Sequence, residues 1–306
     1  MTVPSGKQSY AVSLLILMLG ALGISFSPVF VKLLGVGRIG PTAIGFWRTL
    51  SGGIVLFAIA RARGKQLTVS RHALFWTTFA GFFFFIDLSS WHRSIIYAGS
   101  GMATILANTQ VFSTAVLSFF IFKERLTPRY FIAALSAMVG VALLVGIYSE
   151  GVHFTDIYIR GVIYGLITGL AYGHYIVGIK KAGLDSKRPD LMVMMGWTSL
   201  ASAFFLGLGS FFEPEPFLPP DATAVVLLLA LGLIVQALSW WGIASSLTKI
   251  PTPTAALILL LQPTLAMVWG FVIFHEQLTV LQLLGAVITL AAIYVGSVRQ
   301  APKTSS

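Results

Sequence analysis

The chain has 306 residues, of which 57% are hydrophobic and only 10% are charged, whereas soluble domains carry about 25% charged residues. The formal net charge of +10 comes from basic residues spread over short segments between apolar runs, which excludes a nucleic-acid-binding face and favours topology-setting charge. Cysteine is absent, which excludes disulfides and thiolate metal sites, and no cofactor is predicted.

Long apolar segments recur along the chain and predict an all-α membrane protein. Most are 19 to 25 residues long, enough for a helix to cross a hydrocarbon core of about 30 Å. The connections are short, and most contain Gly, Pro or charged residues, as helix ends do. Ten transmembrane helices are predicted: Tyr10–Leu34, Pro41–Ala60, Ala73–Tyr97, Met102–Phe122, Arg129–Ile147, Tyr158–Lys180, Leu191–Phe211, Ala222–Leu247, Thr254–Phe274 and Val280–Val298.

The distribution of Lys and Arg predicts the orientation of the chain. Residues 1–9 hold one lysine and no cleavage-like site, so the first span is expected to be retained. With this segment inside, 15 basic residues fall on one side of the membrane and 3 on the other. Because basic residues concentrate in cytoplasmic loops, both termini are predicted to be cytoplasmic, in a multi-pass protein of a bacterial-type cytoplasmic membrane.

An internal repeat divides the ten spans into two halves of five. Shifted by 150 residues, Trp47 meets Trp197 and Trp91 meets Trp241. Shifted by 152 residues, the block Phe-Lys-Glu-Arg-Leu-Thr at 122–127 meets Phe-His-Glu-Gln-Leu-Thr at 274–279. Because five is odd, the second copy must enter the membrane from the opposite face, which predicts an inverted-topology repeat with a substrate site between the halves.

The expected domain organisation follows from this repeat. The first five-helix repeat covers residues 10–148 and the second covers 158–298, joined by a linker at 149–157. Residues 1–9 and 299–306 are predicted to be cytoplasmic tails.

Two five-span halves, each with a Glu-x-Leu-Thr sequence between its fourth and fifth spans, resemble the EamA-type branch of the drug/metabolite transporter superfamily. The resemblance covers about residues 10 to 298. It implies an exporter-like secondary transporter of amino acids or other small metabolites, with a substrate that is not inherited with the fold. The family often has Pro in the middle of the fourth and ninth spans; Pro263 fits, but Val111 at the equivalent position does not. Pro28 and Pro263 are therefore predicted to kink the first and ninth spans, and no kink is supported in the fourth.

Ionisable residues inside the second and third spans are the strongest candidates for a functional site. Asp87 is the only acidic residue within a hydrophobic segment, and a charge in hydrocarbon costs at least a few kcal/mol unless it is paired or faces a cavity. A scaffold needs no such charges. Under the 150-residue shift, four ionisable residues of the first half align with apolar or small residues of the second: Arg48 with Thr198, Asp87 with Ala237, His92 with Gly242, and Arg93 with Ile243.

Three roles are open for these charges. Asp87 pairs with Arg48 or Arg93 and locks two helices together; or Arg48 and Asp87 hold the carboxylate and the ammonium of a zwitterion; or Asp87, with His92, couples transport to protons. A carrier of organic or quaternary-ammonium cations is the alternative within this class, because Asp87 lies among tryptophans. An integral membrane enzyme is a remote alternative, since the histidines are dispersed and no catalytic motif is found.

Aromatic and polar residues within the spans complete the predicted substrate-binding set. Trp91 and Trp241 are favoured because the repeat places them symmetrically, and polar side chains at span centres need partners in lipid. Gln110 and Gln262 match across the halves, so an interhelical hydrogen bond explains them as well as substrate contact does. The remaining candidates are Trp47, Asn108, Tyr172, His174, Tyr175, Gln236 and Ser239.

Two further patterns predict packing rather than binding. Four glycines recur every four residues in the sixth span, which predicts close approach of another helix: Gly161, Gly165, Gly169 and Gly173. Glu124 and Glu276, in loops, are expected to bind helix ends. The predicted partners are a small-molecule substrate and the lipid bilayer, without nucleic acid; monomer and homodimer both remain open.

Overall fold

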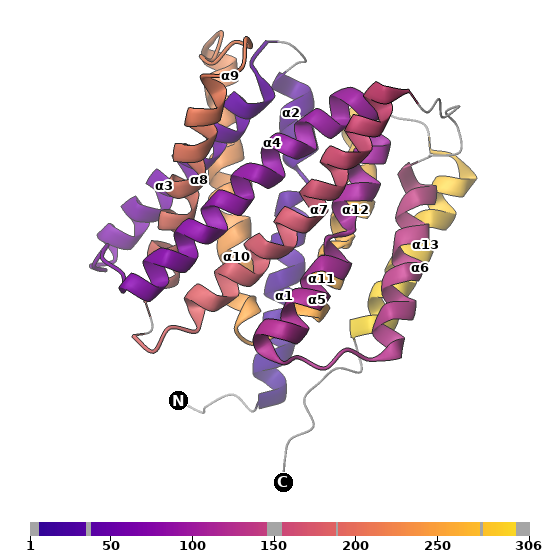
Figure 1. Cartoon of the computed structure of the whole chain (residues 1–306), viewed down its shortest axis with the longest axis horizontal. Coiled ribbons are helices and arrows are strands. Elements are labelled where there is room, and N and C mark those ends of the chain that lie inside the picture. Colours follow the sequence, from indigo (N-terminus) through magenta and orange to yellow (C-terminus); the bar gives the residue numbers. More distant parts are fainter. Residues whose placement is uncertain (1–5, 35–37, 146–154, 188, 276–277, 298–306) are drawn as a thin grey trace.

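The computed structural model describes residues 6–34, 38–145, 155–187, 189–275 and 278–297, and within these ranges the chain is all-helical with no strand (Figure 1). Helices satisfy their own backbone groups, as a lipid environment requires. The elements are α1 (Gly6–Ile24), α2 (Ser27–Leu34), α3 (Pro41–Ala62), α4 (Arg71–Asn108), α5 (Gln110–Phe122), α6 (Pro128–Val145), α7 (Asp156–Gly183), α8 (Leu191–Ser210), α9 (Ala222–Ala230), the π-helix η2 (Leu231–Ser239), α10 (Trp240–Leu247), α11 (Thr252–Leu259), α12 (Leu261–Phe274) and α13 (Val280–Ser297).

Nine stretches of the described residues are long and apolar enough to cross a membrane. The bounds predicted for these nine spans agree with the structure to within three residues at each end. The final helix, α13, has a shorter apolar portion, Val280–Gly296. The nine stretches are Tyr10–Leu34, Pro41–Ala62, Arg71–Ala98, Met102–Phe122, Pro128–Val145, Asp156–Gly183, Leu191–Ser210, Ala222–Leu247 and Thr252–Phe274.

Three spans are broken in the middle, and only two of the breaks have a nearby proline. The first span breaks between α1 and α2, just before Pro28, and the ninth breaks at Leu260, just before Pro263. The fourth span breaks at Thr109 as well, although Val111 stands where the family often has proline. The Thr109 hydroxyl donates to the carbonyl of Leu106 at 2.6 Å, beside the break. The fourth span therefore breaks without a proline, contrary to the prediction.

The glycines of α7 make the close helix contact that their spacing predicts. A Cβ built on Gly165 would lie 2.6 Å from Leu106 Cδ1 and 2.8 Å from Ser94 Oγ. Twelve residues of straight helix would separate Ser94 from Leu106 by about 18 Å, so the chain reverses direction between them and α4 supplies two spans. Ser113 closes the same interface by donating to the carbonyl of Gly169 at 2.7 Å.

Gly169→Ala is expected to destabilise the protein by about 1–3 kcal/mol, the usual result of overpacking. The added methyl group would overlap Thr109 Oγ1 and lie 2.9 Å from the carbonyl oxygen of Leu106, a backbone atom that cannot rotate away. The measurement is thermal unfolding in detergent. Gly242→Ala is the matched control, because its methyl group would meet only Ile16, at 3.5 Å. Equal melting temperatures for the two variants would contradict the packing argument.

The two halves of the chain pack against each other along three helix pairs. Helix α3 lies against α8 and α6 against α13, which are corresponding helices of the repeat, and α4 lies against α7. The indole of Trp47 donates to the carbonyl of Phe217 at 2.9 Å, and the indole of Trp197 donates to the carbonyl of Leu67 at 2.9 Å. The two donors are 150 residues apart in the sequence, and so are the two acceptors. The loops that contain Leu67 and Phe217 lie at opposite ends of the bundle (Figure 1).

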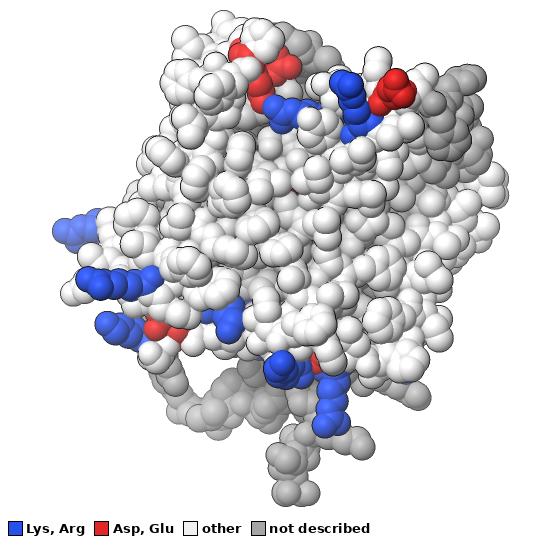
Figure 2. All heavy atoms as spheres, viewed as in Figure 1, with Lys and Arg blue, Asp and Glu red and all other residues white. Residues whose placement is uncertain are grey.

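Charged residues gather at the two ends of the bundle and leave an uncharged band between them (Figure 2). On the visible face, Lys and Arg dominate the lower end, while acidic and basic residues mix at the upper end. Helix α1 begins and α13 ends at the lower end (Figure 1). The band matches the surface that a bilayer covers, because charges avoid the hydrocarbon region.

Candidate functional site

Arg48 lies in the interior of the bundle, between the two halves. It projects from α3 and is only 7% exposed. Its Nε donates to the amide oxygen of Gln236 at 3.1 Å, and the Gln236 amide in turn donates to Ser199 Oγ at 3.1 Å. Among the described residues, the two terminal nitrogens of the guanidinium make no hydrogen bond, so the fork that binds carboxylates in a bidentate manner is left open.

Asp87, on α4, is 8% exposed and faces the same interior region. No Lys, Arg or His nitrogen of the described residues lies within 4.0 Å of its carboxylate. Its charge still interacts over a longer distance with that of Arg48. Thr168 on α7 lies 3.5 Å from the Asp87 carbonyl, which places this turn of α4 in the helix interface and not at the lipid surface. The helix lock suggested for Asp87 is therefore not formed with either arginine.

Four aromatic rings adjoin Arg48. The rings of Phe84 and Tyr175 stack with centroids 4.4 Å apart, and Tyr172 is nearly parallel to Tyr175 at 6.3 Å. The guanidinium carbon of Arg48 lies 5.5 Å from the Phe84 centroid. The fourth ring, Trp240, stands at 72° to 85° to the other three. Four of the predicted site residues thus meet: Arg48, Gln236, Tyr172 and Tyr175.

Trp240 was not predicted as a site residue; symmetry favoured its neighbour Trp241. The regular helix α4 carries Trp91, whereas its counterpart Trp241 follows the π-helix η2. A π-helix places more residues in each turn than an α-helix does, and π-helical segments are frequent at functional sites. Trp240 is 1% exposed among the central rings, while Trp241 is only half-buried, and their counterparts Ser90 and Trp91 differ in the same way. The repeat pairs Trp240 with a serine, so a search for matching tryptophans passes over it.

Arg93 and Trp47 hold a loop in place and do not meet Asp87. The loop at residues 211–221, called the strap here, covers the upper end of α3 and α4. Arg93 donates to Glu213 at 2.5 Å, and Trp47 binds the carbonyl of Phe217 at 2.9 Å. Burial and the neighbouring Glu213 raise the pKa of Glu215, the next carboxylate of the strap.

Three predicted polar residues have their hydrogen bonds satisfied by the scaffold. Gln110 donates to the carbonyl of Ala256 at 3.1 Å and so joins α5 to α11, the interhelical role left open for it. Asn108 donates to the carbonyl of Thr104 at 2.8 Å, and Ser239 donates to that of Ile234 at 2.6 Å, both within their own helical segment. Gln262 also joins two helices, but does so inside the central group by donating to Tyr172 Oη at 3.3 Å. A direct substrate contact by any of these four residues stays a prediction.

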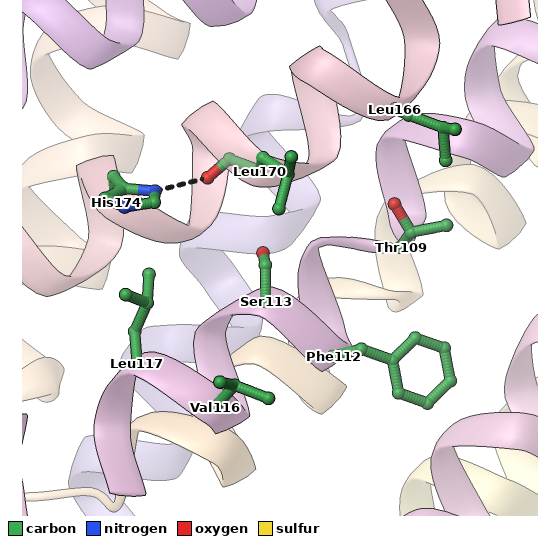
Figure 3. Close-up of a pocket in the computed structure, with 8 residues that line it drawn as sticks. All are labelled: Thr109, Phe112, Ser113, Val116, Leu117, Leu166, Leu170 and His174. Atoms are coloured by element: carbon green, nitrogen blue, oxygen red, sulfur yellow. Dashed lines mark hydrogen bonds between the residues drawn. The ribbon is translucent and has the colours of Figure 1, made fainter. Parts of the chain in front are cut away.

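The two histidines predicted at the site lie in different surroundings. His92 is buried, with its ring centroid 5.2 Å from that of Trp91. His174 stacks on Phe83 at 4.5 Å, and its Nδ1–H donates to the carbonyl oxygen of Leu170 at 2.8 Å. It borders an apolar groove of about 450 Å³ between α5 and α7 (Figure 3). Since Val116 and Leu170 of this groove are half exposed, the groove opens toward lipid.

A buried lysine joins the halves at the lower end of the bundle. Lys180 of α7 is 6% exposed and donates to Glu124 at 2.5 Å and to Thr252 Oγ1 at 2.8 Å. The other oxygen of Glu124 accepts from the backbone N–H of Thr252 at 3.0 Å, which confirms that Glu124 binds a helix end. Glu276 lies outside the described residues. We call Phe122, Glu124, Lys180 and Thr252 the lysine lock.

A corresponding arrangement occurs at the other end. Lys180 Nζ lies 4.8 Å from the centroid of Phe122, and Lys32 Nζ lies 4.1 Å from that of Phe274. The residues that follow the two phenylalanines, Lys123 and His275, are the two described non-glycine residues in the left-handed conformation, with φ of 58° and 55°. The residue after each phenylalanine thus has the same backbone conformation in both halves.

The described residues contain no group of three or more His, Cys, Asp or Glu side chains arranged to hold a metal ion. The interior instead offers an arginine, a carboxylate and aromatic faces, which suit an organic ion. This arrangement, inside a bundle with at least nine membrane-crossing stretches, defines a multi-pass membrane protein with a buried polar site.

Comparison with known proteins gives the family. The model of the EamA-like transporter family matches residues 11–146 and 159–298. The chain belongs to the EamA-like transporter family. The family and the names of the relatives indicate a transporter rather than an enzyme.

Relatives and a solved structure agree with this assignment. A probable amino-acid metabolite efflux pump of Salmonella typhimurium is 27% identical over 204 residues, which are 64% of this chain and 67% of that protein. The uncharacterized transporter YoaV of Bacillus subtilis is 24% identical over 292 residues, which are 92% of this chain and 96% of that one. A crystal structure with 18% identity superposes with a TM-score of 0.81 and covers 94% of this chain and 96% of that chain, which establishes the fold alone.

Proposed function

We propose that this transporter carries a small zwitterion, most simply an amino acid, with Arg48 binding its carboxylate and Asp87 its ammonium. The observation that carries the proposal is the state of these two residues: both are more than nine-tenths buried, and neither forms an ion pair with any described residue. Buried charges cost several kcal/mol each unless they are compensated. A substrate with one charge of each sign supplies that compensation.

The position of the two residues supports transport rather than a structural role. Arg48 and Asp87 come from the first half, while Gln236 and Trp240 of the second half complete the surroundings. A site between two halves can be opened to either side when the halves rock against each other. The export direction rests on the family resemblance and on the printed name of the Salmonella relative.

The symmetry of contacts supports an inverted repeat of ten helices and alternating access. The two tryptophan-to-carbonyl bonds exchange under the 150-residue shift and lie at opposite ends of the bundle. The lysine-on-phenylalanine contacts correspond approximately, because the two phenylalanines are 152 residues apart and the two lysines 148. A carrier needs matched contacts at both ends of the bundle, because the contacts at one end must break while those at the other end stay formed. On the charge bias of the sequence, we assign the lower end, with both termini, to the cytoplasm.

The arginine also favours a zwitterion over a cation. Asp87 beside aromatic rings suits a quaternary ammonium as well, but a buried guanidinium repels a second cation. Proton coupling through Asp87 is compatible with either substrate class.

The test is counterflow in proteoliposomes with purified protein. Vesicles loaded with unlabelled amino acids, amines or quaternary ammonium compounds are exposed to the labelled compound of each class. The expected result is that labelled amino acids accumulate. Their methyl esters, and their analogues without the amino group, should not accumulate. Accumulation of quaternary ammonium compounds alone would replace the proposal with a cation carrier, and the absence of counterflow with every zwitterion would refute it.

A further inference from the structure

We infer that the indole N–H of Trp240 is a substrate-binding donor, which acts beside Arg48 on the carboxylate of the substrate. This inference rests on the proposed function and adds to it a contact from the second half of the protein. It would give the carboxylate one ligand from each half, so that binding could bring the halves together.

The position of Trp240 is the first observation. Its ring lies 4.5 Å from Tyr175, 5.8 Å from Phe84 and 5.8 Å from Tyr172, centroid to centroid. Phe84 is also the ring that Arg48 approaches, at 5.5 Å. Trp240 and the arginine therefore border the same aromatic ring from different helices and different halves.

The unpaired N–H is the second observation. Trp240 is 1% exposed, and its Nε1 is buried without a hydrogen-bond acceptor among the described residues. Burying such a donor unpaired costs about 1–3 kcal/mol, and native proteins retain few such groups without a reason. Trp47, Trp197 and Trp269 show the ordinary behaviour of indoles in this chain, since each donates a hydrogen bond of 2.7 to 2.9 Å.

The third observation is the place of Trp240 along its span. It follows directly after the π-helix η2, which also carries Gln236, the residue that fixes Arg48. Gln236 and Trp240 are four residues apart, about one helical turn, so both lie on the same side of the span. The face that fixes the arginine therefore also carries the indole.

The chemical class of the ligand group follows from the donors. The Arg48 terminal nitrogens and the Trp240 N–H are donors only, so the group they share must accept hydrogen bonds. A carboxylate has two oxygens and can accept from a guanidinium and an indole at once. Charge-assisted bonds of this kind are roughly twice as strong as neutral ones.

The experiment compares Trp240→Phe with Trp76→Phe in the full-length protein. Phenylalanine keeps an aromatic ring and removes the N–H. For Trp240→Phe we expect the apparent Kd of a transported amino acid to rise about tenfold, the equivalent of one good hydrogen bond to a charged group. Trp76→Phe, near the start of α4 and among the rings of Phe75 and Phe79, is expected to leave the apparent Kd unchanged.

Amide analogues make the readout specific. If the N–H binds the carboxylate, Trp240→Phe should weaken the binding of an amino acid more than the binding of its primary amide. A purely structural loss would weaken the binding of both equally. The melting temperature without substrate should fall little, because no protein hydrogen bond is lost. Unchanged affinity in Trp240→Phe would overturn this inference, while Arg48 and Asp87 variants would still test the proposed function separately.

Discussion

Asp87→Asn and Arg48→Gln are each expected to raise the apparent Kd of the transported zwitterion by about 30-fold or more. Each change removes one partner of a desolvated charge pair with the substrate, a loss of at least about 2 kcal/mol, and about 1.4 kcal/mol corresponds to a factor of ten. Binding measured by thermal shift or calorimetry, followed by counterflow, gives the comparison. Both residues are more than nine-tenths buried, so both losses occur out of water.

Arg93→Gln is the matched control for these variants. It removes the same kind of charge from α4, six residues from Asp87, but its partner is Glu213 of the strap. Its effect on the apparent Kd should stay within about threefold, because a charge at the rim influences rates more than affinity. An effect equal to that of Arg48→Gln would show that the site extends to the strap.

The variants also separate substrate binding from a structural role. If Arg48 and Asp87 stabilised each other in the empty protein, the single variants would lower the melting temperature and the double variant would recover part of the loss. Since no ion pair joins them, we expect the single variants to be at least as stable as the parent: each removes an uncompensated buried charge. Lower stability together with unchanged binding would refute the proposed site.

The sequence was sufficient to locate the spans and the buried charges, for a physical reason. A charge in an apolar run stands out in any sequence, because hydrocarbon excludes it unless it has a function or a partner. Arg48 and Asp87 were recognised in this way, and the structure places both in the interior. Glu124 was recognised from the repeat, and its contact with Thr252 is at a helix end as expected.

What the sequence could not reveal depends on features that the repeat does not mark. Trp240 was passed over for Trp241, because the 150-residue shift pairs Trp241 with Trp91 but pairs Trp240 with Ser90. The break at Thr109 was missed because the expected signal was proline, and Val111 stands at that position. The contact of Arg93 with Glu213 was not predicted, since the two residues are 120 apart in the sequence.

Breaking the lysine lock is expected to shift the transporter toward a state open at its lower end. Lys180 joins α7 of the second half to Glu124 of the first and to Thr252. Removing one member of a buried ion pair usually costs 3–5 kcal/mol, and we propose that this contact forms only when the lower end is closed. Even a third of that value, about 1.4 kcal/mol, changes the ratio of the two states tenfold. Lys180→Met is the variant, and Lys249→Met, an exposed lysine near the same end, is its control.

The absence of cysteine makes this shift measurable. Ser118 is fully buried one turn of α5 above Phe122, between the lock and the centre of the bundle. In a Ser118→Cys background, a membrane-impermeant maleimide applied from the cytoplasmic side should label Lys180→Met at least tenfold faster than the parent or the Lys249→Met control. Saturating substrate should change that rate only if it binds one state better than the other. Equal labelling in all three proteins would mean that the lock does not control access, and faster labelling from the opposite side would mean that the assigned orientation is reversed.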